Sequence, residues 1–398
     1  WSNLTLWHTW TTNQSRFCRI WQWSLPRRSD FREKTFLKHH AQVLVVTNYR
    51  SDHQQSMLRF GELLISNKND HPNLEIKEIY PTSVFRNVCL YGKLSKWASY
   101  IDKYLLFPKR LKTEFLLRND PVHLVHIIDH SNAIYLPKLS RISRVKKIVT
   151  CHDLIAIRAA KGDFTQAPKT SKSGKLLQNW ISNSLHHADY YACDSRQTME
   201  DLKKLIPLSE EKSSVFHLGT EAGLSSNSDK KDLSEFIPFD TNTTNYLLHV
   251  GSAAWYKNRK AVIRCFMNAH KILTRSNLKL VLVGPKPQKE ELDDELSNWI
   301  KSNPNAIQSL HNLSENSLAE LYNFAKGLVY PSFIEGFGWP PLEAAVRGCP
   351  VITTRTGAIA DLLGNYAKYV EAKKQSTIDQ SVQELLRSTE SKRNIMSL

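Results

Sequence analysis

Two glutamates in a glycine-containing loop are the residues of this sequence best suited to chemistry. Glu335 and Glu343 are separated by seven residues in the segment 331–345, which reads PSFIEGFGWPPLEAA. Carboxylates suit the vicinal hydroxyls of a sugar, and Gly336 and Gly338 let backbone N–H groups approach a ligand closely. The two prolines predict a helix start that places Glu343 in its first turn. The alternatives are a solvated loop for Glu335 and a favourable helix-end charge for Glu343.

A lysine follows a second glycine in the same half of the chain. Gly251 ends an apolar run, and a helix is predicted to begin near Asn258, directly after Lys257. A glycine turn before a helix N-terminus can hold a diphosphate, and a lysine there adds a positive charge that stabilises it. The alternative is a solvated helix start, since Arg259 and Lys260 are also basic.

Polar pairs follow two apolar runs in the first half of the chain. His152 and Asp153 come directly after one run, and Asp129 and His130 after another. In open α/β sheets ligands bind beyond the carboxyl ends of the strands, so both pairs are candidates for ligand contact. The alternatives are a structural histidine and polar side chains that satisfy loop backbone.

These residues must be positioned by strands that alternate with helices. Short apolar runs recur in two series, and such βα repeats predict parallel, doubly wound sheets. The predicted fold class is α/β, with two Rossmann-like domains facing a central cleft. The expected divisions are a leader or non-fold extension (1–40), an N-terminal Rossmann-like domain (41–225), a linker (226–244) and a C-terminal Rossmann-like domain (245–398). The predicted strands lie at 43–46, 124–128, 147–150, 190–193, 246–250, 280–283, 327–330 and 351–354.

Composition narrows the class of protein. The 398 residues contain six scattered cysteines without a C-x-x-C pair, and no apolar run is long enough to span a membrane. A reducing compartment, the cytoplasm, is therefore expected. The formal net charge is +16, of which +8 lies in residues 41–225. This charge favours an anionic partner, yet no nucleic-acid-binding motif accompanies it, so we expect no nucleic-acid partner.

The segment 93–107 reads as a basic amphipathic helix. Leu94, Trp97, Ile101, Tyr104 and Leu105 share one face at helical spacing, with lysines toward its flanks. One interpretation is an ordinary helix whose apolar face packs on the core of the domain. The other interpretation is peripheral attachment to the inner face of an anionic membrane, together with the basic residues at positions 109 and 110.

The glutamate segment resembles the signature of the retaining GT-B glycosyltransferases of the family 4 type, E-G-F-G-x-P-x-x-E-A. The resemblance extends along most of residues 41 to 372 and is weaker in the first half. It implies transfer of a hexose from a GDP- or UDP-linked sugar to the hydroxyl of a glycan or lipid-linked acceptor, with retained configuration. It also implies helices beyond the last strand that cross back to the first domain, so we expect the C-terminal domain to be truncated.

The resemblance implies that the domain 41–225 lies on the acceptor side and that the domain 245–398 binds the nucleotide sugar. It also assigns roles to the candidate residues. Glu335 contacts the donor sugar, Glu343 the ribose hydroxyls, and His152 helps to orient the reacting centre. Family members pair the phosphate-binding lysine with an arginine, whereas this chain has Tyr256 and Ser252 there, so Lys257 acts alone or with Arg259. The expected catalytic set is His152, Lys257 and Glu335, the donor-binding set is Gly251, Ser252, Lys257, Arg259, Gly336, Phe337, Gly338 and Glu343, and the acceptor-side set is Asp129, His130 and Asp153.

The prediction is therefore a retaining hexosyltransferase whose co-substrate is a nucleotide diphosphate sugar. We expect no obligatory metal or other cofactor, because no Asp-x-Asp motif appears in either domain. An inactive GT-B binding subunit is the alternative, suggested by Ser252, Tyr256 and Ala360 at positions where the family differs. A basic nucleic-acid-binding protein is a weaker alternative.

Overall fold

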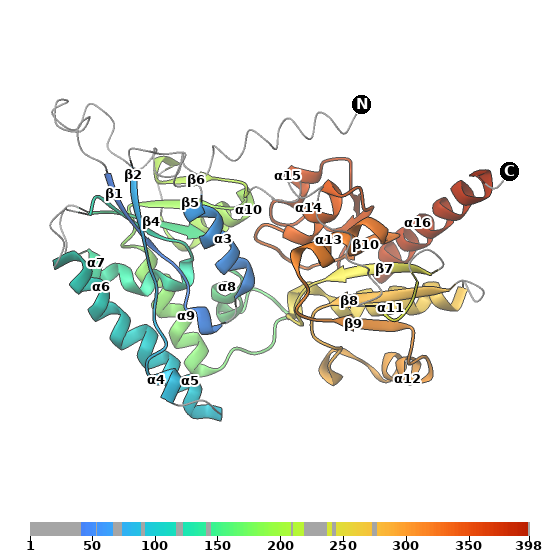
Figure 1. The fold of residues 1–398 in the computed structure, drawn as a ribbon, viewed down its shortest axis with the longest axis horizontal. Helices are drawn as coiled ribbons and strands as arrows, with labels where there is room; N and C mark the ends of the chain where they lie inside the picture. The colour runs from blue at the N-terminus through green and yellow to red at the C-terminus, as the bar shows by residue number, and fades with distance from the viewer. Residues whose placement is uncertain are drawn as a thin grey trace. The chain divides into compact units, whose positions relative to one another are not determined.

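The computed structural model divides into two compact units. Unit 1 comprises the described residues within Trp1–Asp163 and Lys169–Gly219, and unit 2 those within Phe164–Pro168 and Thr220–Leu398 (Figure 1). None of the described helices combines the length and apolar character that crossing a membrane requires. The structure describes residues 41–52, 54–66, 74–88, 92–116, 122–140, 145–207, 210–218, 237–240, 244–272 and 277–396.

Unit 1 contains a six-stranded parallel sheet in the order β2-β1-β3-β4-β5-β6. Every residue of β1 is buried, because helices cover both faces of the sheet and an apolar strand can then point side chains either way. The strand order reverses between β1 and β3, which are direct neighbours. The strands are β1 (Ala41–Val46), β2 (Leu74–Ile79), β3 (Leu124–Ile127), β4 (Lys146–Cys151), β5 (Tyr190–Cys193) and β6 (Ser213–Val215).

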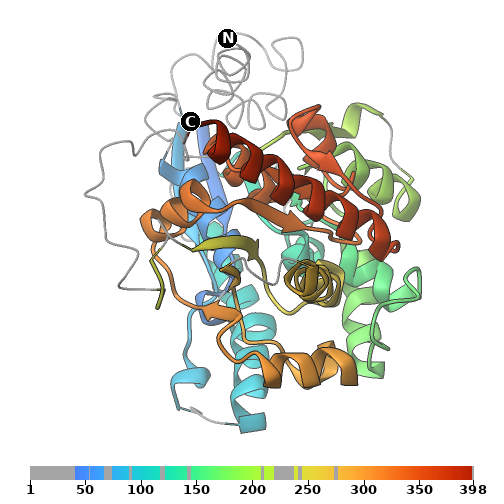
Figure 2. The same ribbon diagram turned by 90° about the vertical axis from the view of Figure 1, so that its right-hand side faces the viewer.

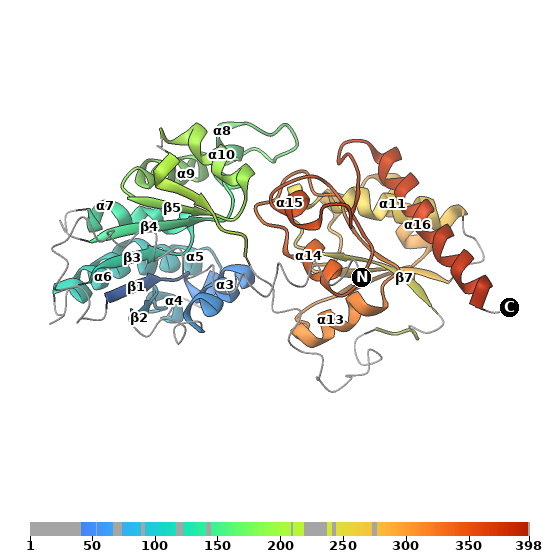
Figure 3. The same cartoon turned by 90° about the horizontal axis from the view of Figure 1, so that it is seen from above.

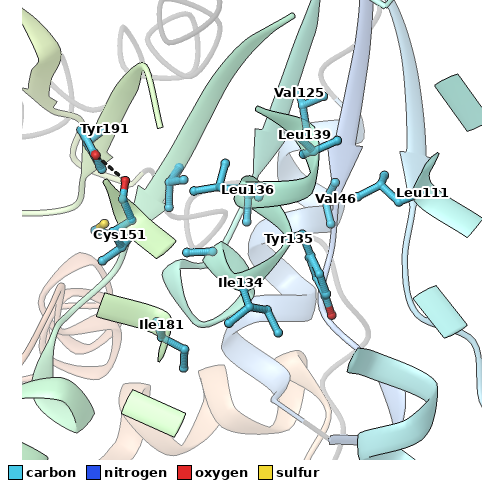
Figure 4. Packing of buried hydrophobic residues seen from close by; sticks show 14 of the residues in the cluster. Val46, Leu111, Val125, Ile134, Tyr135, Leu136, Leu139, Cys151, Ile181 and Tyr191 are labelled. Atoms are coloured by element: carbon cyan, nitrogen blue, oxygen red, sulfur yellow. Dashed lines mark hydrogen bonds between the residues drawn. The ribbon is translucent and has the colours of Figure 1, made fainter. Parts of the chain in front are cut away.

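One face of this sheet packs on a continuous core. Figure 4 shows Val46 and Val125 of the sheet facing Leu136 and Leu139 of the segment after β3.

The helices of unit 1 are α3 (Gln55–Ser66), α4 (Phe85–Val88), α5 (Gly92–Ile101), the π-helical turn η4 (Asp102–Leu106), α6 (Phe107–Leu116), α7 (Leu136–Leu139), α8 (Ile155–Lys161), α9 (Lys172–Leu185) and α10 (Arg196–Leu205), with 3-10 turns η2 (Arg50–Asp52), η5 (His130–Tyr135) and η6 (Glu210–Lys212).

Unit 2 contains a second six-stranded parallel sheet, in the order β12-β11-β10-β7-β8-β9. In chain order this is the arrangement 3-2-1-4-5-6 of dinucleotide-binding folds, with the reversal between β7 and β10. The strands are β7 (Asn245–Val250), β8 (Leu278–Val283), β9 (Ile307–Leu310), β10 (Gly327–Tyr330), β11 (Val351–Thr353) and β12 (Lys368–Tyr369).

Helices lie on both faces of the second sheet. On one side α16 packs against α11 (Figure 2), and on the other lie α13 and α14 (Figure 3). The helices are α11 (Arg259–Ile272), α12 (Asp294–Ser302), α13 (Glu315–Phe324), α14 (Trp339–Val346), α15 (Ile359–Leu363) and α16 (Gln375–Met396), with 3-10 turns η8 (Trp255–Lys257) and η9 (Lys289–Glu291).

The predicted α/β class with two domains is confirmed, because each of the two units holds a parallel, doubly wound sheet. All eight predicted strands occur, whereas β2, β6, β9 and β12 were not predicted from the sequence. Charged or polar residues interrupt β2 and β9, which weakens their apolar pattern. The predicted extension 1–40 and most of the predicted linker 226–244 lie outside the described residues.

Candidate functional site

The strongest cluster of reactive side chains lies at the point where the strand order of unit 2 reverses. Lys257 belongs to the turn η8 that follows β7, and Glu335 lies in the loop that follows β10. Because β7 and β10 are neighbouring parallel strands, their carboxyl ends meet at the same edge of the sheet. Ligands of doubly wound sheets bind at such a point.

Lys257 and Glu335 form an ion pair there. The ammonium Nζ lies 2.8 Å from Oε1 and 3.0 Å from Oε2 of the carboxylate, and it also donates to the phenol oxygen of Tyr330. The two charged side chains are only 14% and 7% exposed, so water screens them weakly. Burial, reinforced by the charge of Glu335, holds the pKa of Tyr330 well above its usual value, and the phenol stays protonated.

Loop contacts fix the position of this pair. Asn258 adopts a left-handed conformation with φ 54°, and its amide donates to the carbonyls of Pro331 at 3.0 Å and Ala372 at 2.9 Å. The backbone N–H of Phe333 donates to the carbonyl of Tyr256 at 2.8 Å. The loops after β7 and β10 are therefore tied together on both sides of the ion pair.

The glycines of the glutamate segment serve packing in this structure. Gly338 has φ +95°, and a Cβ there would lie 2.4 Å from a side-chain carbon of Ile359. Gly357 has φ +59°, and its Cβ would lie 2.5 Å from the carbonyl oxygen of Gly336. Both residues let the loop after β10 lie against the loop after β11. Phe337 is buried as well. Donor contacts by Gly336, Phe337 and Gly338 stay predictions.

The position of Glu343 corrects one expectation. Helix α14 begins at Trp339 with the prolines inside its first turn, so Glu343 lies just beyond that turn. Its Oε2 accepts a hydrogen bond from the phenol of Tyr322 at 3.0 Å, and the carboxylate is 7% exposed. Burial, together with the charge of Glu343, holds the pKa of Tyr322 well above its usual value, which keeps this phenol a donor.

Two buried basic side chains flank the ion pair. Arg259, the first residue of α11, is 2% exposed and donates through Nη2 to the carbonyl of Pro285 at 2.6 Å. Its nearest acid is Glu291, at 3.6 Å from Nε, and within the described part of the chain Nε and Nη1 have no hydrogen-bond partner. Buried guanidinium donors without partners are costly and mark a place where an anion would be stabilised.

His249 of β7 is the second of these side chains. Its Nδ1 pairs with the carbonyl of Val329 at 2.9 Å, while Nε2 lacks a partner among the described residues and points toward Gly251. Burial lowers the pKa of His249 to about 3, so the ring is neutral. Gly251 accordingly lies directly beside the site, whereas Ser252 is exposed and accepts only a long contact from the N–H of Ala254, at 3.4 Å.

In unit 1 the polar residues at the strand ends bind one another. Asp129 caps the turn η5, accepting from the N–H of Ser131 at 2.9 Å, and Asn48 after β1 donates to it at 2.6 Å. Burial opposes the charge of Asp129, but His130, His152 and Ser131 outweigh it and lower its pKa. His130 lies beside it, with Nδ1 at 3.3 Å from Oδ1.

His152 is likewise held inside unit 1. Its Nδ1 lies 2.6 Å from Asp194 Oδ2, and its Nε2 lies 2.8 Å from the carbonyl oxygen of Ile128. Both nitrogens face acceptors, so both carry hydrogen; burial opposes that charge, but Asp194 outweighs it and raises the pKa to about 9. Asp153 accepts from the N–H of Ile155 at 3.0 Å, at the start of α8. The donor and acceptor roles of these residues stay predictions.

Several partners of the predicted residues escaped the sequence analysis. Tyr330 was predicted only as the last residue of a strand, and Tyr322 carried no prediction. Asn48 and Asp194 follow strands without a motif around them. The signal available for all four was their position at or near the carboxyl end of a strand or on the facing helix. Among the residues that the structure describes, no three histidine, cysteine, aspartate or glutamate side chains are grouped as metal ligands.

Comparison with known proteins finds a family match in the second half of the chain. Residues 230–397 match the family "Glycosyl transferases group 1". The O-antigen chain mannosyltransferase RfbU of Salmonella typhimurium is 34% identical over 131 residues, which are 32% of this chain and 34% of that protein. The N-acetyl-alpha-D-glucosaminyl L-malate synthase of Bacillus anthracis is 24% identical over 69% of this chain and 68% of its own. The chain spans about a third or less of the first mannosyltransferases that it matches.

Solved structures extend the likeness in fold to both units. The sucrose-phosphate synthase of Thermosynechococcus elongatus superimposes with a TM-score of 0.65 at 14% identity, covering 87% of this chain and 90% of that one. Anabaena HepE, solved with UDP and glucose, gives a TM-score of 0.60 at 13% identity over 88% and 91% of the two chains. At these identities the likeness establishes the GT-B fold.

Proposed function

We propose that this protein is a retaining glycosyltransferase, and that Lys257 and Glu335 bind the diphosphate and the sugar of its donor. This proposal builds on the group 1 glycosyl transferase domain in residues 230–397. The single observation that carries it is the buried ion pair between Lys257 and Glu335 at the reversal of the strand order. A buried, hydrogen-bonded charge pair in this position is typical of a binding site for a charged ligand.

Binding of the nucleotide sugar would replace the ion pair by contacts of each partner with the ligand. A diphosphate that enters beside Gly251 competes for the ammonium of Lys257, which frees Glu335 to accept from a sugar hydroxyl. Arg259 supports this step, because its Nε and Nη1 donors have no hydrogen-bond partner within the described residues and would gain one in a phosphate. Glu343, held by Tyr322 at 3.0 Å, would accept from the ribose hydroxyls.

The proposed transfer reaction requires no side chain to act as general acid or base. The bond between the anomeric carbon and the phosphate oxygen breaks, and the bonding electrons leave with the nucleotide diphosphate. The acceptor hydroxyl attacks from the same face, and its proton passes to the departing phosphate oxygen. Lys257 stabilises the charge that grows on the diphosphate, and the carboxylate of Glu335 stabilises the positive charge at the anomeric carbon.

A hexose is the proposed sugar, and mannose is the first to test because five of the matched relatives are named mannosyltransferases. The donor is GDP- or UDP-linked, and the acceptor is a glycan or a lipid-linked glycan. Lys257, Arg259 and backbone N–H groups can take the charge of the diphosphate, so we propose turnover without an obligatory divalent metal. Activity that disappeared with a chelator and returned with manganese would contradict this part.

The experiment is a turnover assay with the full chain. A panel of GDP- and UDP-linked hexoses is incubated with oligosaccharide and lipid-linked acceptors, and release of nucleoside diphosphate is measured. NMR of the product then gives the anomeric configuration. We expect release with at least one donor and a product with the donor's configuration. Inverted configuration would overturn the retaining mechanism, and donor binding without any release would indicate a binding subunit instead.

A further inference from the structure

The described residues of unit 1 carry a concentrated, exposed apolar surface. Of the thirteen large hydrophobic side chains that are exposed among the described residues, ten belong to α4 with the residue before it, to α5 with η4, and to α9. Monomeric proteins usually scatter such side chains, so this concentration marks an interaction site. The ten, which we call the tip surface, are Val84, Phe85, Val88, Leu94, Trp97, Tyr100, Ile101, Leu105, Leu176 and Trp180.

Helix α5 shows that the exposure is built into the fold. Its buried side consists of small residues, Ser95, Ala98 and Ser99, whereas Leu94 and Trp97 are 69% and 67% exposed. The helix therefore turns its small side chains inward and its large apolar side chains outward. This result corrects the core-facing interpretation of the segment, because Leu94, Trp97, Ile101 and Leu105 face solvent while only Tyr104 is half-buried.

A buried carboxylate holds α5 in this orientation. Asp102, 1% exposed, accepts from the backbone N–H groups of Val84, Phe85 and Arg86 at 3.2, 2.9 and 3.1 Å. It also accepts from the phenol of Tyr49 at 3.0 Å. These bonds tie α4 to the start of η4. After the π-helical turn the chain faces the core again, since Phe107 and Leu111 are buried.

Aromatic rings join the elements of the tip surface. Trp97 contacts Tyr100 with 5.9 Å between ring centroids, Tyr100 stacks on Tyr104 at 5.5 Å, and Tyr104 meets Trp180 of α9 at 5.6 Å. Figure 1 shows α4 and α5 together at one end of unit 1. The ammonium of Lys103 lies 5.6 Å from the centroids of both Tyr100 and Tyr104.

The charge around the tip surface is mostly positive, although Asp52 of η2 pairs with Lys103 at 2.8 Å. Residues 81–113 contain seven basic residues and a single acid, Asp102, which is buried. Helix α9 contributes two lysines and no acid. The exposed basic residues are Lys96, Lys109, Arg110, Lys112, Lys172 and Lys175.

We infer that the tip surface docks unit 1 on an anionic lipid bilayer. Tryptophan and tyrosine favour the boundary between water and acyl chains, and leucine and valine side chains gain by entering it. Lysines around them are attracted to anionic headgroups, and no exposed acid within residues 81–113 or α9 opposes that attraction. This inference does not depend on the proposed glycosyl transfer, because vesicle binding is measured without a donor.

The test is co-sedimentation of the full chain with vesicles. Vesicles of phosphatidylcholine alone are compared with vesicles that contain about a third phosphatidylglycerol, at salt from about 0.1 M to about 0.5 M. We expect binding that rises about tenfold or more with anionic lipid and falls with salt. A chain that binds neither vesicle at low salt, or binds both equally, would overturn the inference.

Substitutions locate the contact. The double variant Leu94→Ser/Trp97→Ser should lose about tenfold or more in vesicle affinity, because two inserting side chains are removed. The matched control Ile272→Ser/Phe324→Ser removes two exposed apolar side chains of unit 2 and should bind like the wild type. Thermal unfolding and nucleotide binding of both variants check that they fold.

Charge reversal gives an independent arm. Lys96→Glu/Lys109→Glu should weaken binding to anionic vesicles, while Lys96→Arg/Lys109→Arg should keep it. Equal binding by the wild type and both apolar and charge-reversed variants would show that another part of the chain holds the vesicle, and would overturn the inference. Wild type that ignores vesicles but forms a defined complex through Trp97 would assign the tip surface to a protein partner.

Discussion

The two sheets present different kinds of polar edge at the point where their strand order reverses. In unit 1, Asn48 after β1 and Asp129 after β3 bind each other at 2.6 Å. In unit 2, Lys257 and Glu335 also pair, yet beside them Arg259 keeps two guanidinium nitrogens without hydrogen-bond partners within the described residues. Asn48 and Asp129 thus use each other as partners, although Nδ1 of the neighbouring His130 lacks a hydrogen-bond partner within the described residues. The second edge differs because its orphaned donors belong to a guanidinium group, which favours an anion. Under the proposed function the donor binds at the second edge, and we expect Asn48 at the first edge to act mainly on stability.

The largest effect is expected from removal of the ammonium. Lys257→Met should lower kcat by about 10²–10³-fold, as loss of a charge-stabilising group commonly does. Lys257→Arg should recover part of this loss because it retains the charge. Steady-state turnover with the preferred donor measures both. If Lys257→Met kept the wild-type kcat, the ammonium of the second edge would have no role in catalysis.

The buried pair of unit 1 should make stability depend on pH. The pKa of His152 is raised to about 9 from 6.5, so its stabilisation is complete below pH 6.5 and is lost as the pH rises through about 9. The free energy of unfolding should fall by about 3 kcal/mol over this range. Denaturant titrations at several pH values measure it. In His152→Gln the slope should flatten; an unchanged slope would show that other groups titrate.

The two glutamates of unit 2 should separate in their kinetic effects. Glu335→Gln should lower kcat by about tenfold to a hundredfold with little change in nucleotide affinity, because contacts to the reacting sugar tighten in the transition state. Glu343→Gln should instead weaken nucleotide binding by about tenfold and leave kcat nearly intact. Steady-state kinetics with calorimetry distinguish the two. Identical profiles in both variants would contradict the assignment of separate roles.

The smallest effect on function is expected at the edge of unit 1. Asn48→Ala removes hydrogen bonds to Asp129, Gln54 and Asn132 and leaves Asp129 buried with fewer partners. It should lower the free energy of unfolding by about 1–3 kcal/mol without altering nucleotide affinity. Thermal or chemical unfolding measures the first quantity and calorimetry the second. If Asn48→Ala lost nucleotide affinity at unchanged stability, the first edge rather than the second would bind the nucleotide.

The sequence was sufficient to predict most strands, because an apolar run between turn residues can be buried only inside a sheet covered on both faces. Strands β2 and β9 were missed, since LEIKEI and IQSL carry polar residues at a sheet edge. The glutamate segment and Lys257 were found because their loops carry distinctive residues. Their meeting at one edge could be expected from the parallel strands, but the bond between them could not.

Other features depend on tertiary context that a local pattern does not contain. The pairing of His152 with Asp194 joins residues 42 positions apart and requires the register of β4 against β5. The orientation of α5 was open because its apolar stripe would serve a core equally well. Asp102, which receives the N–H groups of α4, decides that the stripe faces solvent.

The measurement that tests the central claim most directly is calorimetric titration of the full chain with UDP and with GDP. It compares the wild type, Lys257→Met in the second edge and Asn48→Ala in the first. We predict that the wild type binds one of the two nucleotides, that Lys257→Met binds it about tenfold or more weakly, and that Asn48→Ala retains wild-type affinity. Wild-type affinity in Lys257→Met, or a loss confined to Asn48→Ala, would contradict the placement of the donor site in unit 2.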